Sequence, residues 1–208
     1  MTSGTGTGFR VPQDCLRDHN LQATAMRQSK WSYRADFALY PLMVGAAGMQ
    51  ALADAGSTQF EAGIAAAFTG LFAWTAIEYG LHRWVLHRVQ PFKRMHEAHH
   101  ANPTAFIGTP TWLSAALFLG TWAALTAELS RSVAGGLAAG LMLGYVVYTA
   151  VHDAVHHLRA RPGSWLQRAK LRHALHHRPG SQSNFGVSTA LWDKVMGTAV
   201  KPHENPAR

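Results

Sequence analysis

The stretch Gly144-Tyr145-Val146-Val147-Tyr148-Thr149-Ala150-Val151-His152-Asp153-Ala154-Val155-His156-His157 joins an apolar run directly to a group of histidines. The apolar run starts at Val133 and reaches Val151 without a proline or a charged residue. Residues three and four apart lie on one face of a helix, so His152 and His156 would project to the same side. The sequence therefore predicts one long helix that carries imidazoles just beyond its apolar part.

Three other histidine groups resemble this one in spacing. Eleven of the thirteen histidines fall into four boxes, which are His82-x4-His87, His96-x2-His99-His100, His152-x3-His156-His157 and His173-x2-His176-His177. The second and fourth boxes each project three imidazoles from one helix face, and we expect helices over residues 92–100 and 165–177. The five-residue spacing of the first box turns its side chains by roughly 140° on an ideal α-helix, which predicts a bend or a helix end there.

Imidazole is the commonest metal-ligating side chain near neutral pH. A single ion takes roughly three to six ligands, so about ten converging nitrogens indicate two ions. Haem ligation is an alternative, but it needs only two histidines for each haem and leaves most of the boxes unexplained. The pattern favours a polyhistidine metal centre.

Four apolar runs predict an all-α integral membrane protein. Each run would form a helix of roughly 24–28 Å, close to the ~30 Å hydrocarbon core of a bilayer. A soluble helical bundle with buried helices is the alternative interpretation. The four predicted spans are residues 37–53, 62–77, 111–127 and 133–151.

The positions of the basic residues predict the orientation of these spans. In a four-span arrangement, eighteen of the nineteen Lys and Arg residues lie on one side of the membrane, which the positive-inside rule assigns to the cytoplasm. Both termini and every histidine box would then be cytoplasmic, at the inner membrane if the host is bacterial. The net charge of +8 suits anionic headgroups or an acidic electron donor, and no nucleic-acid motif is present.

We expect one membrane domain over residues 37–200. A partly disordered cytoplasmic segment over residues 1–36, without a cleavable signal peptide, would precede it, and a short tail over residues 201–208 would follow. Cys15 is the single cysteine, which excludes an intrachain disulfide and a thiolate-rich metal site. The sequence leaves the oligomeric state undetermined.

Nitrogen ligands beside lipid indicate redox chemistry. A hydrolytic zinc site normally needs about three protein ligands and has no redox activity. Two redox metals can reduce dioxygen and oxidise an unactivated C–H bond, such as those of acyl chains, sterols and carotenoids. No residue is assigned as a proton donor. Candidates for carboxylates that orient imidazole N–H groups are Glu78, Glu97, Asp153 and Asp193. For each of them, an ordinary helix salt bridge is the alternative interpretation.

The boxes resemble those of the fatty acid hydroxylase and sterol desaturase superfamily of membrane di-iron oxygenases. Over about residues 60–200 the sequence is most similar to the fatty acid 2-hydroxylase branch. Besides the boxes, the matching stretches are Gly144-Tyr145-Val146-Val147-Tyr148, Gly163-Ser164-Trp165-Leu166, Asn184-Phe185-Gly186-Val187-Ser188-Thr189 and Leu191-Trp192-Asp193.

This resemblance implies four membrane helices under a cytoplasmic helical cap that holds a dinuclear metal site. It also implies two iron ions, O2 as co-substrate and hydroxylation of a membrane lipid acyl chain, with 2-hydroxylation as one outcome. Zinc is expected to replace iron in some recombinant material. The implied ligands are His82, His87, His96, His99, His100, His152, His156, His173, His176 and His177, and His157 would be an extra histidine that supports the site without binding metal.

Two departures from the family pattern keep alternatives open. The eukaryotic fatty acid 2-hydroxylases carry an N-terminal cytochrome b5 domain, and 36 residues are too few for one. We therefore expect a separate electron donor, which could be cytochrome b5-like, a ferredoxin or a reductase. Only eight residues separate His87 from His96. This spacing is shorter than in typical lipid hydroxylases and nearer to that of carotenoid ring hydroxylases, which are the alternative enzyme class. A membrane metal-binding or transport protein is the alternative from another class.

Overall fold

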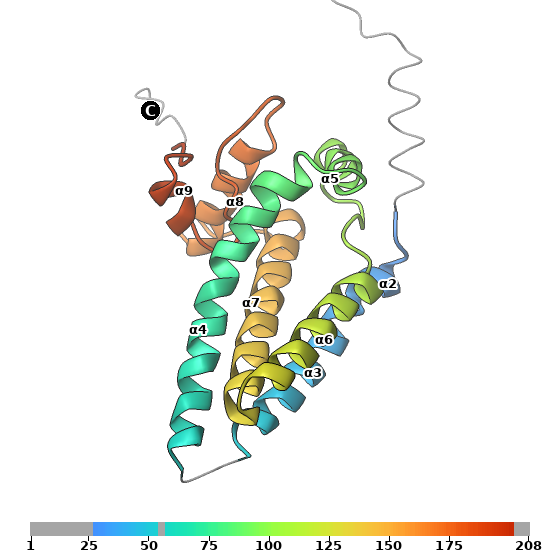
Figure 1. Ribbon diagram of the computed structural model, residues 1–208. Helices are drawn as coiled ribbons and strands as arrows, with labels where there is room; N and C mark the ends of the chain where they lie inside the picture. The colour runs from blue at the N-terminus through green and yellow to red at the C-terminus, as the bar shows by residue number, and fades with distance from the viewer. Residues whose placement is uncertain (1–26, 54–56, 202–208) are drawn as a thin grey trace, which may run out of the picture.

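All regular secondary structure in the part of the chain described by the computed structural model, residues 27–53 and 57–201, is helical (Figure 1). Cys15, most of the predicted N-terminal segment and residues 202–208 of the predicted tail lie outside the described residues. The elements are α2 (Lys30–Arg34), α3 (Asp36–Ala51), α4 (Thr58–Gly80), η1 (Leu81–Leu86), α5 (Phe92–Ala101), α6 (Thr111–Glu128), α7 (Arg131–His157), α8 (Trp165–His176) and α9 (Leu191–Val195).

The four apolar runs form the four longest helices, α3, α4, α6 and α7. In Figure 1 these helices make a bundle, and α5, α8 and α9 gather at one end of it. By length and composition, two continuous helical segments can cross a membrane, Thr58–Leu86 and Arg131–His157. The all-helical fold is therefore confirmed, whereas a membrane span at each of the four runs stays a prediction.

Glycines on α7 let this helix lie directly against the backbone of α4. A Cβ atom at Gly136 would lie 2.1 Å from the carbonyl oxygen of Gly63, and one at Gly140 would lie 2.0 Å from that of Ala67. Only glycine fits at such distances, and small residues in this spacing are typical of packed membrane helices. The close contact fixes α4 relative to α7. Histidines follow on η1, which continues α4, and lie at the C-terminal end of α7.

Aromatic residues and methionines fill the bundle between α3, α4, α6 and α7. The buried cluster includes Tyr40, Met43, Trp74, Met142 and Tyr145. Other large apolar side chains point outward on the same helices; Leu42 on α3 is 73% exposed and Phe68 on α4 is 70% exposed. Exposed apolar patches of this kind mark a surface that contacts lipid or another protein.

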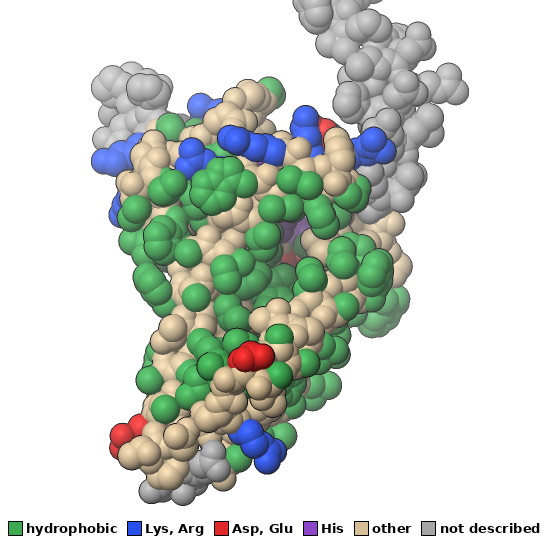
Figure 2. All heavy atoms as spheres, viewed as in Figure 1, with side chains coloured by type: hydrophobic (Ala, Val, Ile, Leu, Met, Phe, Trp, Pro, Cys, Tyr) green, Lys and Arg blue, Asp and Glu red, His purple; other side chains and the backbone are tan. Residues whose placement is uncertain are grey.

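Charge is concentrated at the end of the bundle that carries the histidines. On the face shown in Figure 2, Lys and Arg side chains form a belt across this end, above a surface of mostly hydrophobic side chains. The opposite end carries few charged groups in this view. The distribution agrees with an apolar bundle in a bilayer and a basic end in water.

Candidate metal centre

The first histidine box lies on a π-helix that continues α4. In η1 (Leu81–Leu86) the backbone bonds join residues five apart, so such residues lie above one another on the helix. His87 follows as the C-cap residue, and its ring stacks on that of His82 with centroids 5.4 Å apart. The predicted helix end at His87 is therefore confirmed, while a π-helical turn, which the sequence analysis did not predict, brings the two imidazoles to one side.

Nine of the ten predicted ligands fall into two groups with converging ring nitrogens. Within each group, one nitrogen from every residue lies within 4.8 Å of the others. The five-histidine group is His82, His87, His96, His100 and His176, and the four-histidine group is His99, His156, His173 and His177. The groups are neighbours, since the rings of His100 and His177 stack with centroids 4.1 Å apart.

Helical spacing divides two of the boxes between these groups. On α5, His96 and His100 are four residues apart and face the five-histidine group, while His99 faces the other. On α8 and its C-cap, His173 and His177 have the same spacing and face the four-histidine group. Each of these two boxes therefore contributes to both groups, and the shared helices keep the two groups side by side.

His152 lies against the four-histidine group without being part of it. Its ring centroid is 4.7 Å from those of His99 and His156 and 5.1 Å from that of His173. Its assignment as a ligand stays a prediction, supported by this position.

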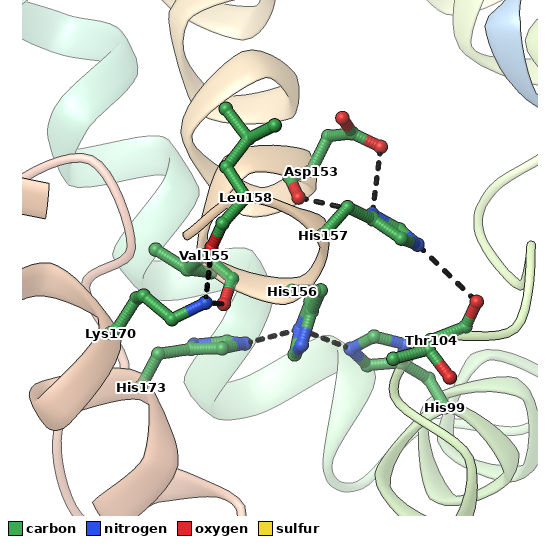
Figure 3. Close-up of polar contacts among 9 residues, drawn as sticks. All are labelled: His99, Thr104, Asp153, Val155, His156, His157, Leu158, Lys170 and His173. Atoms are coloured by element: carbon green, nitrogen blue, oxygen red, sulfur yellow. Dashed lines mark hydrogen bonds and ion pairs between the residues drawn. The ribbon is translucent and has the colours of Figure 1, made fainter. Parts of the chain in front are cut away.

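His157 is held away from both groups by other partners (Figure 3). Its Nδ1 atom lies 3.1 Å from a carboxyl oxygen of Asp153, and its Nε2 atom lies 3.3 Å from the carbonyl oxygen of Thr104. In Figure 3, its ring stands apart from the row formed by His99, His156 and His173. This arrangement fits the prediction that His157 does not bind metal.

Backbone carbonyl groups of the segment 183–189, here called the tail loop, orient two imidazoles of the five-histidine group. The Nδ1 atom of His82 donates to the carbonyl oxygen of Phe185 at 2.5 Å, and that of His176 donates to Ser183 at 3.0 Å. A neutral imidazole carries one N–H group, so these bonds leave the Nε2 lone pair free on each ring.

The freed lone pairs face other ring nitrogens at short range. The Nε2 atom of His82 lies 3.0 Å from that of His96, and the Nε2 atom of His176 lies 3.1 Å from that of His100. Converging lone pairs are favourable when a cation lies among them. The donor set therefore fits a metal ion that accepts imidazole nitrogens.

The four-histidine group is not oriented in this way. The Nδ1 atoms of His99, His173 and His177 are buried and have no hydrogen-bond partner among residues 27–53 and 57–201. The two groups thus differ in how firmly the surrounding protein fixes their rings.

Glu78 on α4 holds one half of the tail loop. Its Oε1 atom accepts hydrogen bonds from the backbone N–H groups of Val187 at 2.7 Å and Ser188 at 2.9 Å, and its Oε2 atom accepts one from the Ser188 hydroxyl. The prediction that Glu78 orients an imidazole directly is wrong. It acts instead on the loop that carries the orienting carbonyl groups.

Asp193 on α9 holds the other half. Its Oδ1 atom accepts from the backbone N–H of Phe185 and its Oδ2 atom from that of Gly186, both at 2.8 Å. The hydroxyl of Thr198 also donates to Oδ1 at 2.7 Å. Asp193 is fully buried, and the partners of its two carboxylate oxygens are backbone N–H groups of the tail loop and the Thr198 hydroxyl. It therefore supports the loop and does not contact an imidazole ring.

The remaining two carboxylates, Glu97 and Asp153, form ion pairs outside the two histidine groups. Glu97 lies 3.6 Å from the ammonium group of Lys93, and its side chain is 59% exposed. Asp153 pairs with His157. Glu97 therefore forms an ordinary helix ion pair, which is the alternative interpretation for it. Asp153 orients an imidazole, but it is that of His157, which belongs to neither histidine group.

Burial keeps the clustered imidazoles neutral. It lowers the pKa of His100, His176 and His177 to about 3, and it lowers the pKa of His96, His99 and His173 well below the usual value. Neighbouring imidazoles lower these pKa values further. Neutral imidazole is the form that binds metal.

An all-helical protein with two adjoining polyhistidine groups at the end of an apolar bundle is a candidate dinuclear metalloprotein. The sequence model of the fatty acid hydroxylase family matches residues 67–198, and the chain belongs to this family.

Relatives of known sequence and structure agree with this assignment. The fatty acid 2-hydroxylase of Rattus norvegicus is 33% identical over 151 residues, which cover 66% of this chain and 40% of that protein. The ceramide very long chain fatty acid hydroxylase scs7 of Schizosaccharomyces pombe is 30% identical over 152 residues, covering 67% of this chain and 43% of that protein. The matched region thus spans about 40% of the length of these relatives.

A solved structure described as full-length scs7p, with only the hydroxylase domain visible, has a similar fold. The TM-score is 0.66 at 29% sequence identity, and the match covers 86% of this chain and 69% of that one.

Proposed function

We propose that this protein is a membrane-bound, O2-dependent di-iron hydroxylase of lipid acyl chains, acting at the carbon next to the acyl carbonyl. The convergence of nine imidazole nitrogens in two adjoining groups at the end of an apolar bundle carries this proposal. The relatives are fatty acid and ceramide hydroxylases, which favours an acyl-lipid substrate over a carotenoid ring.

The proposed ligands are the five-histidine group for one ion and the four-histidine group with His152 for the other. When bound, two iron ions would supply the capacity to activate dioxygen and to oxidise an unactivated C–H bond. The chain's own contribution is to keep the imidazoles neutral and oriented and to exclude bulk water by burying them.

The proposed architecture has four membrane spans, with the histidine-bearing end in the cytoplasm. The belt of Lys and Arg around this end supports that orientation (Figure 2). It also suits an electron donor with an acidic surface, because complementary charges steer encounter between proteins. We propose a separate donor, such as a cytochrome b5-like protein, a ferredoxin or a reductase.

A transport function fits the geometry less well. Transporters bind their substrates near the bilayer midplane. Both histidine groups instead lie at one end of the bundle, and their members come from η1, from the last turns of α5 and α8 and from the end of α7.

Lipid analysis of a host that expresses the chain tests the proposal. Wild-type protein should produce acyl lipids heavier by one oxygen atom, with the new hydroxyl group on C2 of the acyl chain. The His176→Ala variant should produce none. Metal analysis of purified protein should give about two iron ions per chain, or zinc where the host supplies it. Oxidation products confined to carotenoids, or fully retained activity in His176→Ala, would contradict the proposal.

A further inference from the structure

Residues 191–201, which comprise α9 and the six residues after it and are here called the α9 segment, expose mainly apolar side chains. The exposed large apolar side chains are Leu191, Val195, Met196 and Val200, of which Val195 is 63% exposed. The exposed charged side chains of the segment are Lys194 and Lys201, whereas Asp193 is buried. Apolar side chains accompanied by lysines are typical of a segment at the surface of a bilayer, because the long lysine side chain reaches the headgroups while its neighbours contact acyl chains.

The α9 segment packs against α4 near the end of the predicted membrane span. The indole Nε1 atom of Trp192 donates a hydrogen bond to the Thr75 hydroxyl at 2.9 Å, and the ring centroids of Trp192 and Phe72 are 6.1 Å apart. The span was predicted over residues 62–77, so Trp192 lies beside its last two turns. Tryptophan is enriched at this depth, where acyl chains meet headgroups.

Lipid fits this surface better than a second protein does. Phe68 and Phe72 are four residues apart on one exposed face of α4, so the apolar surface of the α9 segment continues from Trp192 down into the span. A soluble partner protein cannot cover that continuation, whereas acyl chains can cover all of it. The two lysines of the segment would add attraction to anionic headgroups.

The same segment is bonded to the tail loop at two points. Asp193 accepts the hydrogen bonds described above, and Asn184 provides the second point. The backbone N–H of Asn184 donates to the carbonyl oxygen of Thr198 at 3.0 Å, and its side-chain amide makes two hydrogen bonds to the backbone of Val200, at 3.0 and 3.1 Å. The α9 segment therefore supports the loop whose carbonyl groups orient imidazoles of the five-histidine group.

Resting on the membrane architecture and the metal centre proposed above, we propose that the α9 segment is an interfacial anchor through which the bilayer supports the five-histidine group. Val195, Met196 and Val200 enter the boundary between headgroups and acyl chains, and burial of their apolar surface holds the segment and the tail loop in place. The partner is the lipid surface as a whole, not a lipid molecule that is oxidised. In a purely structural role, the hydrogen bonds alone would hold the loop, and these exposed side chains would be dispensable.

The first experiment measures where the segment lies. In a full chain with Cys15→Ser, a nitroxide is attached at Val195→Cys or Val200→Cys. Phe68→Cys in the span and Glu97→Cys on α5 serve as references for lipid and water. The protein is loaded with zinc, which is diamagnetic, and reconstituted in phosphatidylcholine nanodiscs. Collisions of the nitroxide with O2, which concentrates among acyl chains, are compared with collisions with a water-soluble nickel chelate.

We expect the ratio of O2 to nickel collisions at positions 195 and 200 to lie close to that at position 68. A ratio equal to that at position 97 would place the segment in water and overturn the proposal. A water-like ratio at position 68 as well would instead contradict the proposed membrane span. Because the labelled positions are exposed, this measurement leaves the packing of the protein intact.

The second experiment measures the link to the metal centre as the rate of zinc release to a chelator, in the same nanodiscs. The double variant Val195→Asn with Met196→Asn should release about one of its two ions roughly fivefold faster than wild type or more, since the anchor loses apolar surface. The matched double variant Val195→Leu with Met196→Leu keeps that surface and should release zinc at the wild-type rate.

Equal release rates in the two double variants would overturn the link between the bilayer and the metal centre. If the asparagine variant does not fold, the single variant Val195→Asn is compared with Val195→Leu in the same way. Neither experiment requires turnover. Failure of the proposed hydroxylase activity is therefore a separate result, in which wild-type protein oxidises no lipid while the collision ratios and zinc release rates are as expected.

Discussion

The Nδ1 atom of His82 lies 2.5 Å from the carbonyl oxygen of Phe185, which follows it by 103 residues in the chain. An imidazole on η1, which continues α4, is therefore oriented by the tail loop, and Asp193 in turn holds that loop through the Phe185 N–H. The link gives the five-histidine group a support that the four-histidine group lacks, and it implies that the two proposed metal ions can be lost separately.

Asp193→Asn should release metal from the five-histidine group first. The amide offers one oxygen where the carboxylate offered two, so a tail-loop N–H loses its acceptor and the carbonyl groups shift. Outer partners of metal-binding histidines typically contribute roughly 10- to 100-fold in affinity. After dialysis against a chelator, metal content should fall from about two ions per chain toward one. Glu97→Gln, which removes an exposed ion pair, should keep the wild-type metal content. If both variants keep the same metal content, the tail loop does not support the five-histidine group.

His156→Ala and His157→Ala should differ sharply although the residues are adjacent. The Nε2 atom of His156 lies 3.1 Å from that of His99 and 2.9 Å from that of His173, whereas His157 pairs with Asp153 (Figure 3). Loss of His156 should abolish acyl hydroxylation and remove metal from the four-histidine group. Loss of His157 should leave about two ions per chain and measurable activity. Metal analysis and product mass spectrometry check both, and metal loss in His157→Ala would show that the ligand set is incorrect.

The helices could be predicted because long apolar runs and histidine spacing are local signals. Residues 111–127 were expected to be helical and form Thr111–Glu128, and residues 92–100 form Phe92–Ala101. The division of the boxes was not predicted. The spacing indicated three imidazoles on one face of each helix, whereas His96 and His100 face one group and His99 faces the other. The π-helix at the first box could not be predicted from α-helical periodicity, although the five-residue spacing signalled an irregularity.

The supports of the site could not be predicted because they join distant segments through backbone atoms. Glu78 accepts hydrogen bonds from backbone N–H groups more than a hundred residues away, and a peptide group has no side-chain signature. The signature Asn184-Phe185-Gly186 was a usable signal, but the sequence alone did not show which side chains it faces.

Metal-free protein should lose stability as the pH falls below about 6.5. Burial lowers the pKa of His100, His176 and His177 to about 3, while each has an ordinary pKa near 6.5 in the unfolded chain. Between these values the unfolded chain binds more protons than the folded one, so the free energy of unfolding decreases by about 1.4 kcal/mol per pH unit for each such histidine. Denaturant unfolding of chelator-treated protein from pH 7.5 to 5 measures this slope, and a flat profile would contradict the burial of neutral imidazoles.

Gly140→Ala should destabilise the bundle and the metal centre together. The added methyl group would lie 2.0 Å from the carbonyl oxygen of Ala67 and 2.7 Å from the backbone nitrogen of Leu71, so α4 and α7 must separate. Overpacking of this kind costs roughly 1–3 kcal/mol. Because η1, which continues α4, and α7 carry histidines of different groups, the metal content of both groups should fall. Gly120→Ala on α6, where no atom lies within 4 Å of the new methyl group, should have the wild-type unfolding temperature or a higher one. A similar loss of stability in both variants would show that helix–helix contact at Gly140 is not the cause.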